Sequence, residues 1–164
     1  AYFEVSKTGQ SFIVQTKGMK IEVLGTTFNI SAYANEEYQT TLVSGSVKVQ
    51  TENGSNRIVK PSEQACITSG SNQINVRNVD TAFYTSWIHG KINFKDQRLD
   101  DIMKTLARWY DMDVVYENEA TKELRFVCYV NRYNEITPLV KLLEQTGRVT
   151  VTVEGKTIKI FTNH

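Results

Sequence analysis

Over residues 1–79, apolar and polar positions alternate in short runs that are separated by turn-forming residues. In MKIEVL, for example, Met19, Ile21 and Val23 share one side of an extended chain, and the charged residues share the other. A period of two indicates β-strand, and it recurs in YFEV, SFIVQ, TFNISAY, TTLVSGSVKVQ, RIVK, QACIT and QINVRNV. Asn53-Gly54 is typical of a hairpin turn, because both residues tolerate positive φ. We therefore predict an all-β domain, sandwich or solenoid-like, over residues 1–79.

A helical period appears further along the chain. DQRLDDIMKTLARWY carries an apolar stripe, at Leu99, Ile102, Met103 and Leu106. Asp96 is available as its cap. In NEITPLVKLLEQTG a second stripe begins near Pro138 and should stop at Gly147. Strand-like runs surround both, so the order from Ile88 is β-α-β-β-α-β-β, which predicts a small α+β domain over residues 87–164 after a linker or short helix at 80–86.

Composition narrows the class of protein. The chain is 40% apolar and 23% charged, which is typical of a soluble globular protein. Its net charge is +1, so no basic field exists to bind nucleic acid. No run of 18 apolar residues occurs. AYFEV opens without a Met and in the middle of a pattern, and we expect the chain to be part of a longer protein.

Few residues could carry catalysis or bind a metal. The sequence has two histidines, which excludes a multi-histidine zinc site. A Ser-His-Asp triad would have to use His89, which lies beside a turn, and we do not expect it to be catalytic. Asp100 and Asp101 are about 100° apart on a helix and cannot converge. Asp111 and Asp113 lack a third oxygen ligand nearby in the sequence. We expect no metal and no cofactor.

The two cysteines, Cys66 and Cys128, are too far apart in the sequence for a metal-binding spacing. They also do not form a disulfide framework of the kind found in small secreted domains. We interpret them as two buried small residues.

The pair Gly25-Thr26 in VLGTTFNISAY admits two interpretations. The Thr hydroxyl could attack the Gly carbonyl and shift the acyl group from nitrogen to oxygen, which leaves an ester that hydrolyses readily. A Gly permits the strained backbone that this attack needs. Alternatively, the pair is a glycine bulge that bends one strand into the next. The residues alone leave both interpretations open.

Several unlike motifs follow one another in an order that resembles a known family. AYFEV, VLGTTFNISAY, TLVSGSVKV and the PSEQA of residues 61–65 are similar to the second half of the periplasmic domain of FecR-type anti-sigma regulators. WIHGKINFKDQRLDDIMKTLARWYDMDVVYE resembles their C-terminal domain in members from the Bacteroidetes, which also looks like the short N-terminal domain of secretins and TonB-dependent transducers. Ser62 stands where the family usually has Gly, and Arg98 stands where a Pro often opens the helix. The resemblance implies that residues 1–79 are an N-terminally truncated all-β domain.

The resemblance also implies a role in cell-surface signalling and transcription regulation. Such proteins sit in the inner membrane and restrain an extracytoplasmic-function (ECF) sigma factor through a cytoplasmic segment. Their periplasmic part binds the signalling domain of a TonB-dependent outer-membrane transducer. We expect this chain to be periplasmic, with the membrane helix and the sigma-binding segment absent from it. Some members cut themselves at the Gly-Thr that matches Gly25-Thr26; otherwise no enzymatic activity is expected.

We predict the partner contact at an exposed strand edge, because an unpaired edge can bind a partner strand through backbone hydrogen bonds. Two runs qualify, Thr157 to Phe161 and Leu124 to Val130. The candidate contact residues are Tyr129, Arg125, Ile158 and Ile160. Alternation separates Tyr129 from the apolar face of its strand, although a core position for this aromatic is the alternative.

Three further hypotheses concern glycan binding, glycosylation and dimerisation. The first domain could instead be a direct glycan sensor, using Tyr33, Tyr38 or Trp87 for stacking. Thr81, in Asp80-Thr81-Ala82, resembles the O-glycosylation acceptor of Bacteroidetes periplasmic proteins. A sheet edge left open by absent upstream strands could also pair with another copy, which would give a homodimer.

Overall fold

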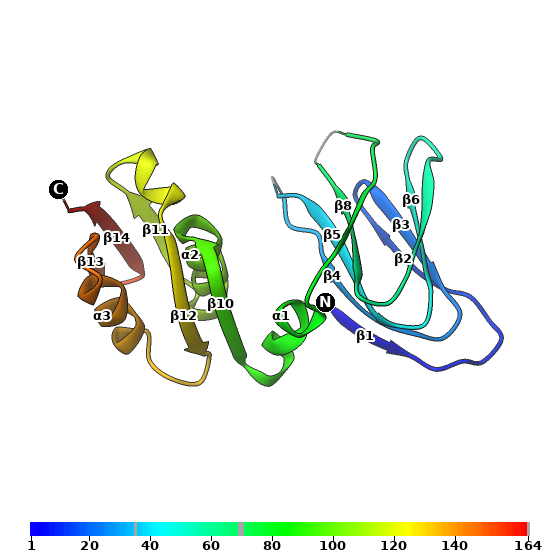
Figure 1. Ribbon diagram of the computed structural model, residues 1–164, viewed down its shortest axis with the longest axis horizontal. Helices are drawn as coiled ribbons and strands as arrows, with labels where there is room; N and C mark the ends of the chain where they lie inside the picture. Colours follow the sequence, from blue (N-terminus) through cyan, green and yellow to red (C-terminus); the bar gives the residue numbers. More distant parts are fainter. Residues whose placement is uncertain (35, 69–70, 164) are drawn as a thin grey trace. The chain divides into compact units, whose positions relative to one another are not determined.

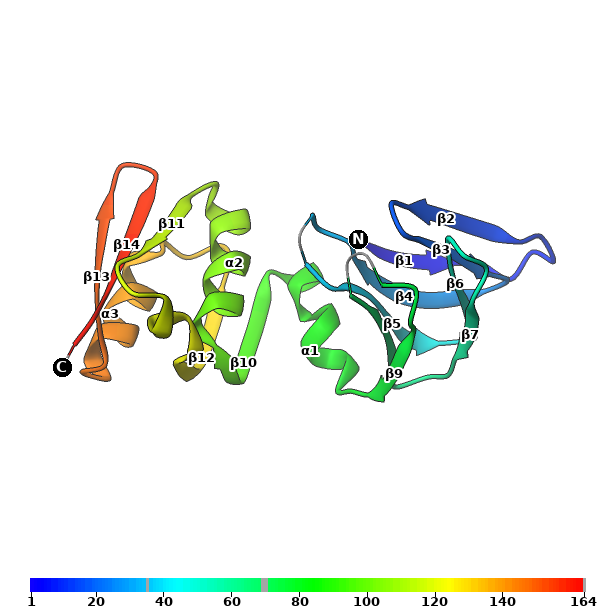
Figure 2. The same ribbon diagram turned by 90° about the horizontal axis from the view of Figure 1, so that it is seen from above.

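The computed structural model describes residues 1–34, 36–68 and 71–163. Contacts divide the chain into two compact units, Ala1–Thr85 (unit 1) and Ser86–His164 (unit 2), both drawn in Figures 1 and 2. None of the helices in the described ranges is long and apolar enough to cross a membrane.

Unit 1 is built from two antiparallel sheets. Its elements are β1 (Tyr2–Val5), β2 (Phe12–Thr16), β3 (Met19–Val23), β4 (Thr26–Ser31), β5 (Tyr38–Ser44), β6 (Val47–Thr51), β7 (Asn56–Val59), β8 (Glu63–Ile67), β9 (Asn75–Asn78) and the short helix α1 (Thr81–Thr85). One sheet has the order β1-β4-β5-β8-β9 and the other β2-β3-β6-β7. The expected linker at 80–86 thus contains α1, which contacts β5 of the same unit.

The core of unit 1 lies between these two sheets and follows from the period-two pattern. Met19, Ile21 and Val23 of β3 are buried against Phe28 and Leu42 of the other sheet. Each such buried side chain stabilises the fold by about 1.5–3 kcal/mol relative to an exposed one. The prediction of an all-β first half is therefore confirmed.

Two turns of unit 1 depend on left-handed backbone. Gly54 has φ +89° between the paired strands β6 and β7, which confirms the predicted hairpin. Ser62, where the resemblance led us to expect Gly, also has positive φ (+67°). Its N–H donates to the Leu42 carbonyl at 3.0 Å, and its carbonyl accepts from Val79 at 2.9 Å. The family's turn is thus formed with Ser in place of Gly.

Unit 2 packs two helices with two small sheets. Its elements are η1 (Ser86–His89), β10 (Lys91–Arg98), α2 (Leu99–Tyr110), β11 (Asp113–Tyr116), η2 (Glu119–Glu123), β12 (Arg125–Asn131), α3 (Thr137–Gln145), β13 (Val149–Glu154) and β14 (Thr157–Thr162). The sheets have the orders β10-β12 and β11-β14-β13. Figure 2 shows α2 between β10 and β11, and α3 contacts β12 and β13. The predicted order β-α-β-β-α-β-β is confirmed.

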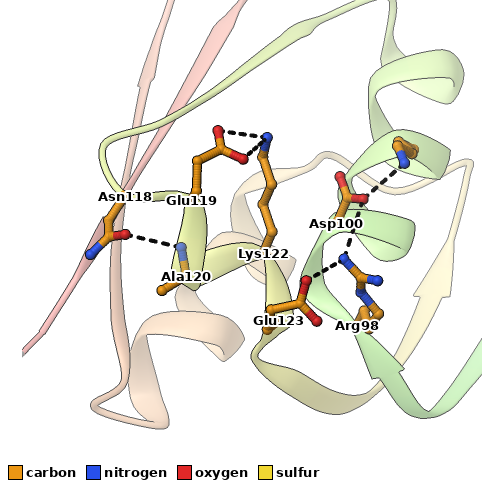
Figure 3. A network of polar contacts seen from close by, with 8 residues as sticks. Arg98, Asp100, Asn118, Glu119, Ala120, Lys122 and Glu123 are labelled. Carbon is orange, nitrogen blue, oxygen red and sulfur yellow. Dashed lines mark hydrogen bonds and ion pairs between the residues drawn. The ribbon is translucent and has the colours of Figure 1, made fainter. Parts of the chain in front are cut away.

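The start of α2 differs from the prediction. Asp96 is not its cap; it lies in β10 with φ +51°, at an irregularity in the pairing of β10 with β12. Arg98 occupies the cap position with extended backbone and no side-chain cap bond. Figure 3 shows what its guanidinium does instead: Nη2 lies 2.7 Å from Glu123 of η2 and 4.0 Å from Asp100. Within η2, Figure 3 also shows a separate ion pair between Lys122 and Glu119.

The two cysteines are buried free thiols, Cys66 in unit 1 and Cys128 in unit 2. Burial raises the pKa of the Cys66 thiol to about 12 and the pKa of the Cys128 thiol to about 11. Because the thiolate is the reactive form, we expect neither thiol of the folded chain to react with a disulfide reagent at pH 8. Both should react in denaturant. Stoichiometric labelling of the native chain within minutes would contradict this prediction.

Candidate functional site

Gly25-Thr26 lies where the chain crosses from one sheet of unit 1 to the other. β3 ends at Val23 and β4 begins at Thr26 in the opposite sheet. A second crossing, Gly45–Ser46, connects β5 to β6 directly beside the first. A Cβ on Gly45 would lie 2.6 Å from the Gly25 carbonyl oxygen, and one on Gly25 would lie 2.7 Å from Cβ of Lys7. Both glycines thus allow the backbones to approach closely.

The hydroxyl of Thr26 holds these two crossings together. The residue is 3% exposed, and its Oγ1 donates a hydrogen bond to the Ser46 carbonyl at 3.0 Å. An acyl shift requires a base that takes the hydroxyl proton, and a peptide carbonyl is not a base near neutral pH. The observed contact shows that Thr26 joins the two crossings, and self-cleavage at Gly25-Thr26 stays a hypothesis.

An open groove of about 560 Å³ adjoins the crossing. Gly25, Thr26 and Gly45 line it together with Leu24 of the same crossing. Three further lining side chains come from the outer face of the four-stranded sheet, namely Ile58, Glu22 and Lys48. Glu22 is the acidic residue of this lining, and its Oε1 accepts a hydrogen bond from the Ser11 hydroxyl at 3.1 Å.

The expected edge at Thr157 to Phe161 is wrong. β14 is the central strand of its sheet, paired in parallel with β11 and antiparallel with β13. Ile158 and Ile160 are each 0% exposed in the core of unit 2. They cannot contact a partner while the unit is folded.

The second predicted edge has the expected geometry. Among the described residues, β12 pairs with β10 and with no other strand. Its inward residues Phe126, Cys128 and Val130 are buried, whereas Arg125, Val127 and Tyr129 face outward. Tyr129 is 57% exposed and Val127 is 71% exposed, so the alternative core position for Tyr129 is wrong.

Guanidinium groups surround this strand. Arg125 pairs with Asp96 at 3.4 Å. Arg148, at the start of β13, lies over the Phe126 ring at 5.2 Å and donates to the Arg125 carbonyl at 2.8 Å. At the other end Arg132 lies over the Trp109 ring at 5.9 Å. Guanidinium groups therefore lie at both ends of β12.

Sequence reasoning missed two residues that bind β12 from a distance. Arg148 reaches a carbonyl 23 positions earlier. The Tyr110 hydroxyl lies 3.3 Å from the Asn131 carbonyl, 21 positions later, and 2.8 Å from the Asn134 carbonyl. Neither residue has a local sequence pattern that predicts such a contact. Tyr133 is a further exposed aromatic, and its ring lies so close to Gly90 that a Cβ there would clash with it.

The aromatics proposed for glycan binding differ in their surroundings. Tyr33 is 45% exposed, whereas the ring of Tyr38 covers Gly18 and packs against the core of unit 1. Trp87 belongs to η1 in unit 2. Thr81 is half-buried at the start of α1, and its carbonyl accepts from the Thr85 hydroxyl at 3.0 Å.

Of the acidic residues considered for metal binding, Asp111 and Asp113 both lie near Lys156. Asp111 is fully exposed at the end of α2 and pairs with Lys156, whose hydrogen bond lowers the pKa of the Asp111 carboxyl. Across residues 1–34, 36–68 and 71–163, no three potential metal ligands of the His, Cys, Asp or Glu type come together.

Comparisons with known proteins match both units. A family model described as FecR protein matches residues 1–48, and one described as FecR, C-terminal matches residues 91–160. Two crystal structures of a candidate anti-sigma factor from Parabacteroides distasonis ATCC 8503 have the same fold, with TM-scores of 0.84 and 0.83 at 21% identity. The likeness covers 99% of this chain and 77% or 76% of those chains. No curated protein matches the chain.

Proposed function

The chain belongs to the FecR family of anti-sigma factors, and from this premise we propose that it is the periplasmic signal-receiving part of an inner-membrane regulator. In this proposal it binds the signalling domain of a TonB-dependent outer-membrane transducer. A cytoplasmic segment outside this chain then controls an ECF sigma factor. The chain acts by binding, without catalysis on another molecule.

The observation that carries the proposal is the outer face of β12. Tyr129 and Val127 are large, exposed and adjacent on one face of a strand that has a free edge. Aromatic side chains with a polar tip are enriched among the residues that dominate protein interfaces. A surface of this kind suits a protein partner better than a small molecule, which is usually bound in a concave pocket.

Affinity capture tests the proposal. The chain serves as bait for detergent-solubilised envelopes of the organism that encodes it, with mass spectrometry as the readout. Specific recovery of a TonB-dependent transducer with an additional N-terminal domain is the expected result. If folded bait recovers no such transducer, the proposal fails, and a glycan screen on the same bait then tests direct ligand sensing.

Self-cleavage at Gly25-Thr26 is decided by a separate measurement. Because the Thr26 hydroxyl is bonded to the Ser46 carbonyl, we expect denaturing mass spectrometry to show a single species at the intact mass. Two species whose masses add up to the intact mass plus one water would contradict this. In that case Thr26→Val, which lacks the hydroxyl, should abolish the split.

The same variant measures the structural role of the hydroxyl. Thr26→Val removes one hydrogen bond at constant shape, so we expect the free energy of unfolding to fall by about 1 kcal/mol. Thr26→Ser keeps the hydroxyl and provides the matched control for the bond, although it also loses a buried methyl group. A Val variant as stable as the native chain would show that the bond contributes nothing.

A further inference from the structure

Backbone groups along β12 point alternately toward β10 and away from it. The Arg132 N–H donates to the Gly90 carbonyl at 2.7 Å, and the Leu124 carbonyl accepts from the Leu99 N–H at 2.7 Å. The even-numbered residues between them are therefore the ones that bond to β10, because main-chain direction alternates along a strand. The N–H and C=O groups of residues 125, 127, 129 and 131 point to the free edge.

Side chains close the two ends of this free edge. The Arg148 guanidinium donates to the Arg125 carbonyl at 2.8 Å. At the other end, the Tyr110 hydroxyl lies 2.8 Å from the Asn134 carbonyl and 3.3 Å from the Asn131 carbonyl, so its one proton is shared between these two acceptors. Between them, the main-chain groups of Val127 and Tyr129 form no hydrogen bond on this side with any described residue. We call this stretch, Val127 to Tyr129, the open window.

Arginine residues lie at both ends of the open window. Arg125 and Arg148 lie at one end and Arg132 follows the other end. On the neighbouring strand, exposed Lys91 lies opposite Asn131 in the pairing register. Two carboxylates near this group are already paired, Asp96 with Arg125 and Glu123 with Arg98.

We propose that the open window binds an extended acidic segment of the partner protein as an added strand. Two alternate residues of that segment exchange backbone hydrogen bonds with Val127 and Tyr129, and its acidic side chains contact the guanidinium groups at the two ends. The stretch from Arg125 to Asn131 spans about 20 Å, so about six residues of partner are bound. The inference rests on the proposed function only for which protein supplies the segment.

Val127→Pro tests this mode of binding directly. The variant lacks the N–H that faces the free edge, and Pro is tolerated on an edge strand at a position whose N–H is not used by the sheet. Val127→Thr keeps the N–H and the β-branched shape, and it is the matched control. With the purified signalling domain of the recovered transducer as probe, we expect Val127→Pro to lose at least about tenfold in affinity and Val127→Thr to stay within about threefold. Wild-type affinity in a folded Val127→Pro chain would overturn the inference and leave the proposed function intact.

A peptide probe keeps the inference testable if no transducer binds. Acetyl-Glu-Val-Thr-Val-Glu-amide is titrated into the ¹⁵N-labelled chain, with the Lys-Val-Thr-Val-Lys peptide as the charge control. We expect the amide signals of Val127 and Tyr129 to shift with the acidic peptide and to shift less with the basic one. No shift at millimolar acidic peptide, or an equal response to both peptides, would overturn the inference. Dimerisation of the wild-type chain that Val127→Pro abolishes would assign the window to a second copy and would also overturn it.

Discussion

Gly45→Ala is expected to lower the free energy of unfolding by about 3 kcal/mol or more. Gly45 has φ +91°, where an L side chain costs about 1–2 kcal/mol. The new Cβ would also lie 2.6 Å from the Gly25 carbonyl oxygen and 3.0 Å from Cα of Thr26. Because both are backbone atoms of the adjacent crossing, no rotation of a side chain relieves the clash, and the two sheets must move apart.

Gly54→Ala is the matched control for this prediction. Gly54 has nearly the same φ (+89°), but a Cβ there would meet no atom within 4 Å. It should therefore cost only the backbone strain of about 1–2 kcal/mol. Urea denaturation of the two variants measures the difference, which is the contribution of close contact between the crossings. Equal losses of stability would show that the crossings have room to adjust and that Gly45 is needed only for its conformation.

The elements of both units could be predicted because local periodicity reports which side of an element is buried. β3 alternates strictly, and the stripe of α2 recurs at helical spacing, so each shows its core-facing side. The position of a strand within its sheet is different, because it depends on partners far away in the sequence. β14 alternates because only one face of its sheet is buried. It nevertheless lies between β11 and β13, in the centre of that sheet. The alternation therefore could not distinguish a central strand from an edge.

The same limit applies to the site. Alternation along β12 predicted that Arg125 and Tyr129 share the face opposite the core. The residues that cap the strand, Arg148 and Tyr110, come from other elements, and only the tertiary fold brings them to their carbonyls. At Asp96, a local sequence signal was present but predicted the wrong role. Asp is a common helix cap, but it also tolerates left-handed backbone, and the irregular pairing of β10 uses the second property.

Tyr129→Glu is expected to weaken binding of the transducer's signalling domain by about 30-fold, which is about 2 kcal/mol. The substitution removes the exposed aromatic ring from the face of β12 and places a carboxylate where we propose that an acidic segment binds. Since Tyr129 is 57% exposed and lies opposite Asn93 on the surface, folding should be almost unaffected. Isothermal titration calorimetry measures the affinity, and thermal unfolding checks the fold.

Two further variants separate the causes of this loss. Tyr129→Phe keeps the ring and should bind within a few-fold of the native chain, whereas Tyr33→Glu makes the same change in charge on an exposed tyrosine of unit 1 and should have no effect. A Tyr129→Glu chain that folds and binds normally would remove β12 from the interface. A loss shared by Tyr33→Glu would instead indicate that added negative charge anywhere on the chain repels the partner. Loss in Tyr129→Glu alone would place the contact on the outer face of β12, next to the open window, because no other position in this set lies on that strand.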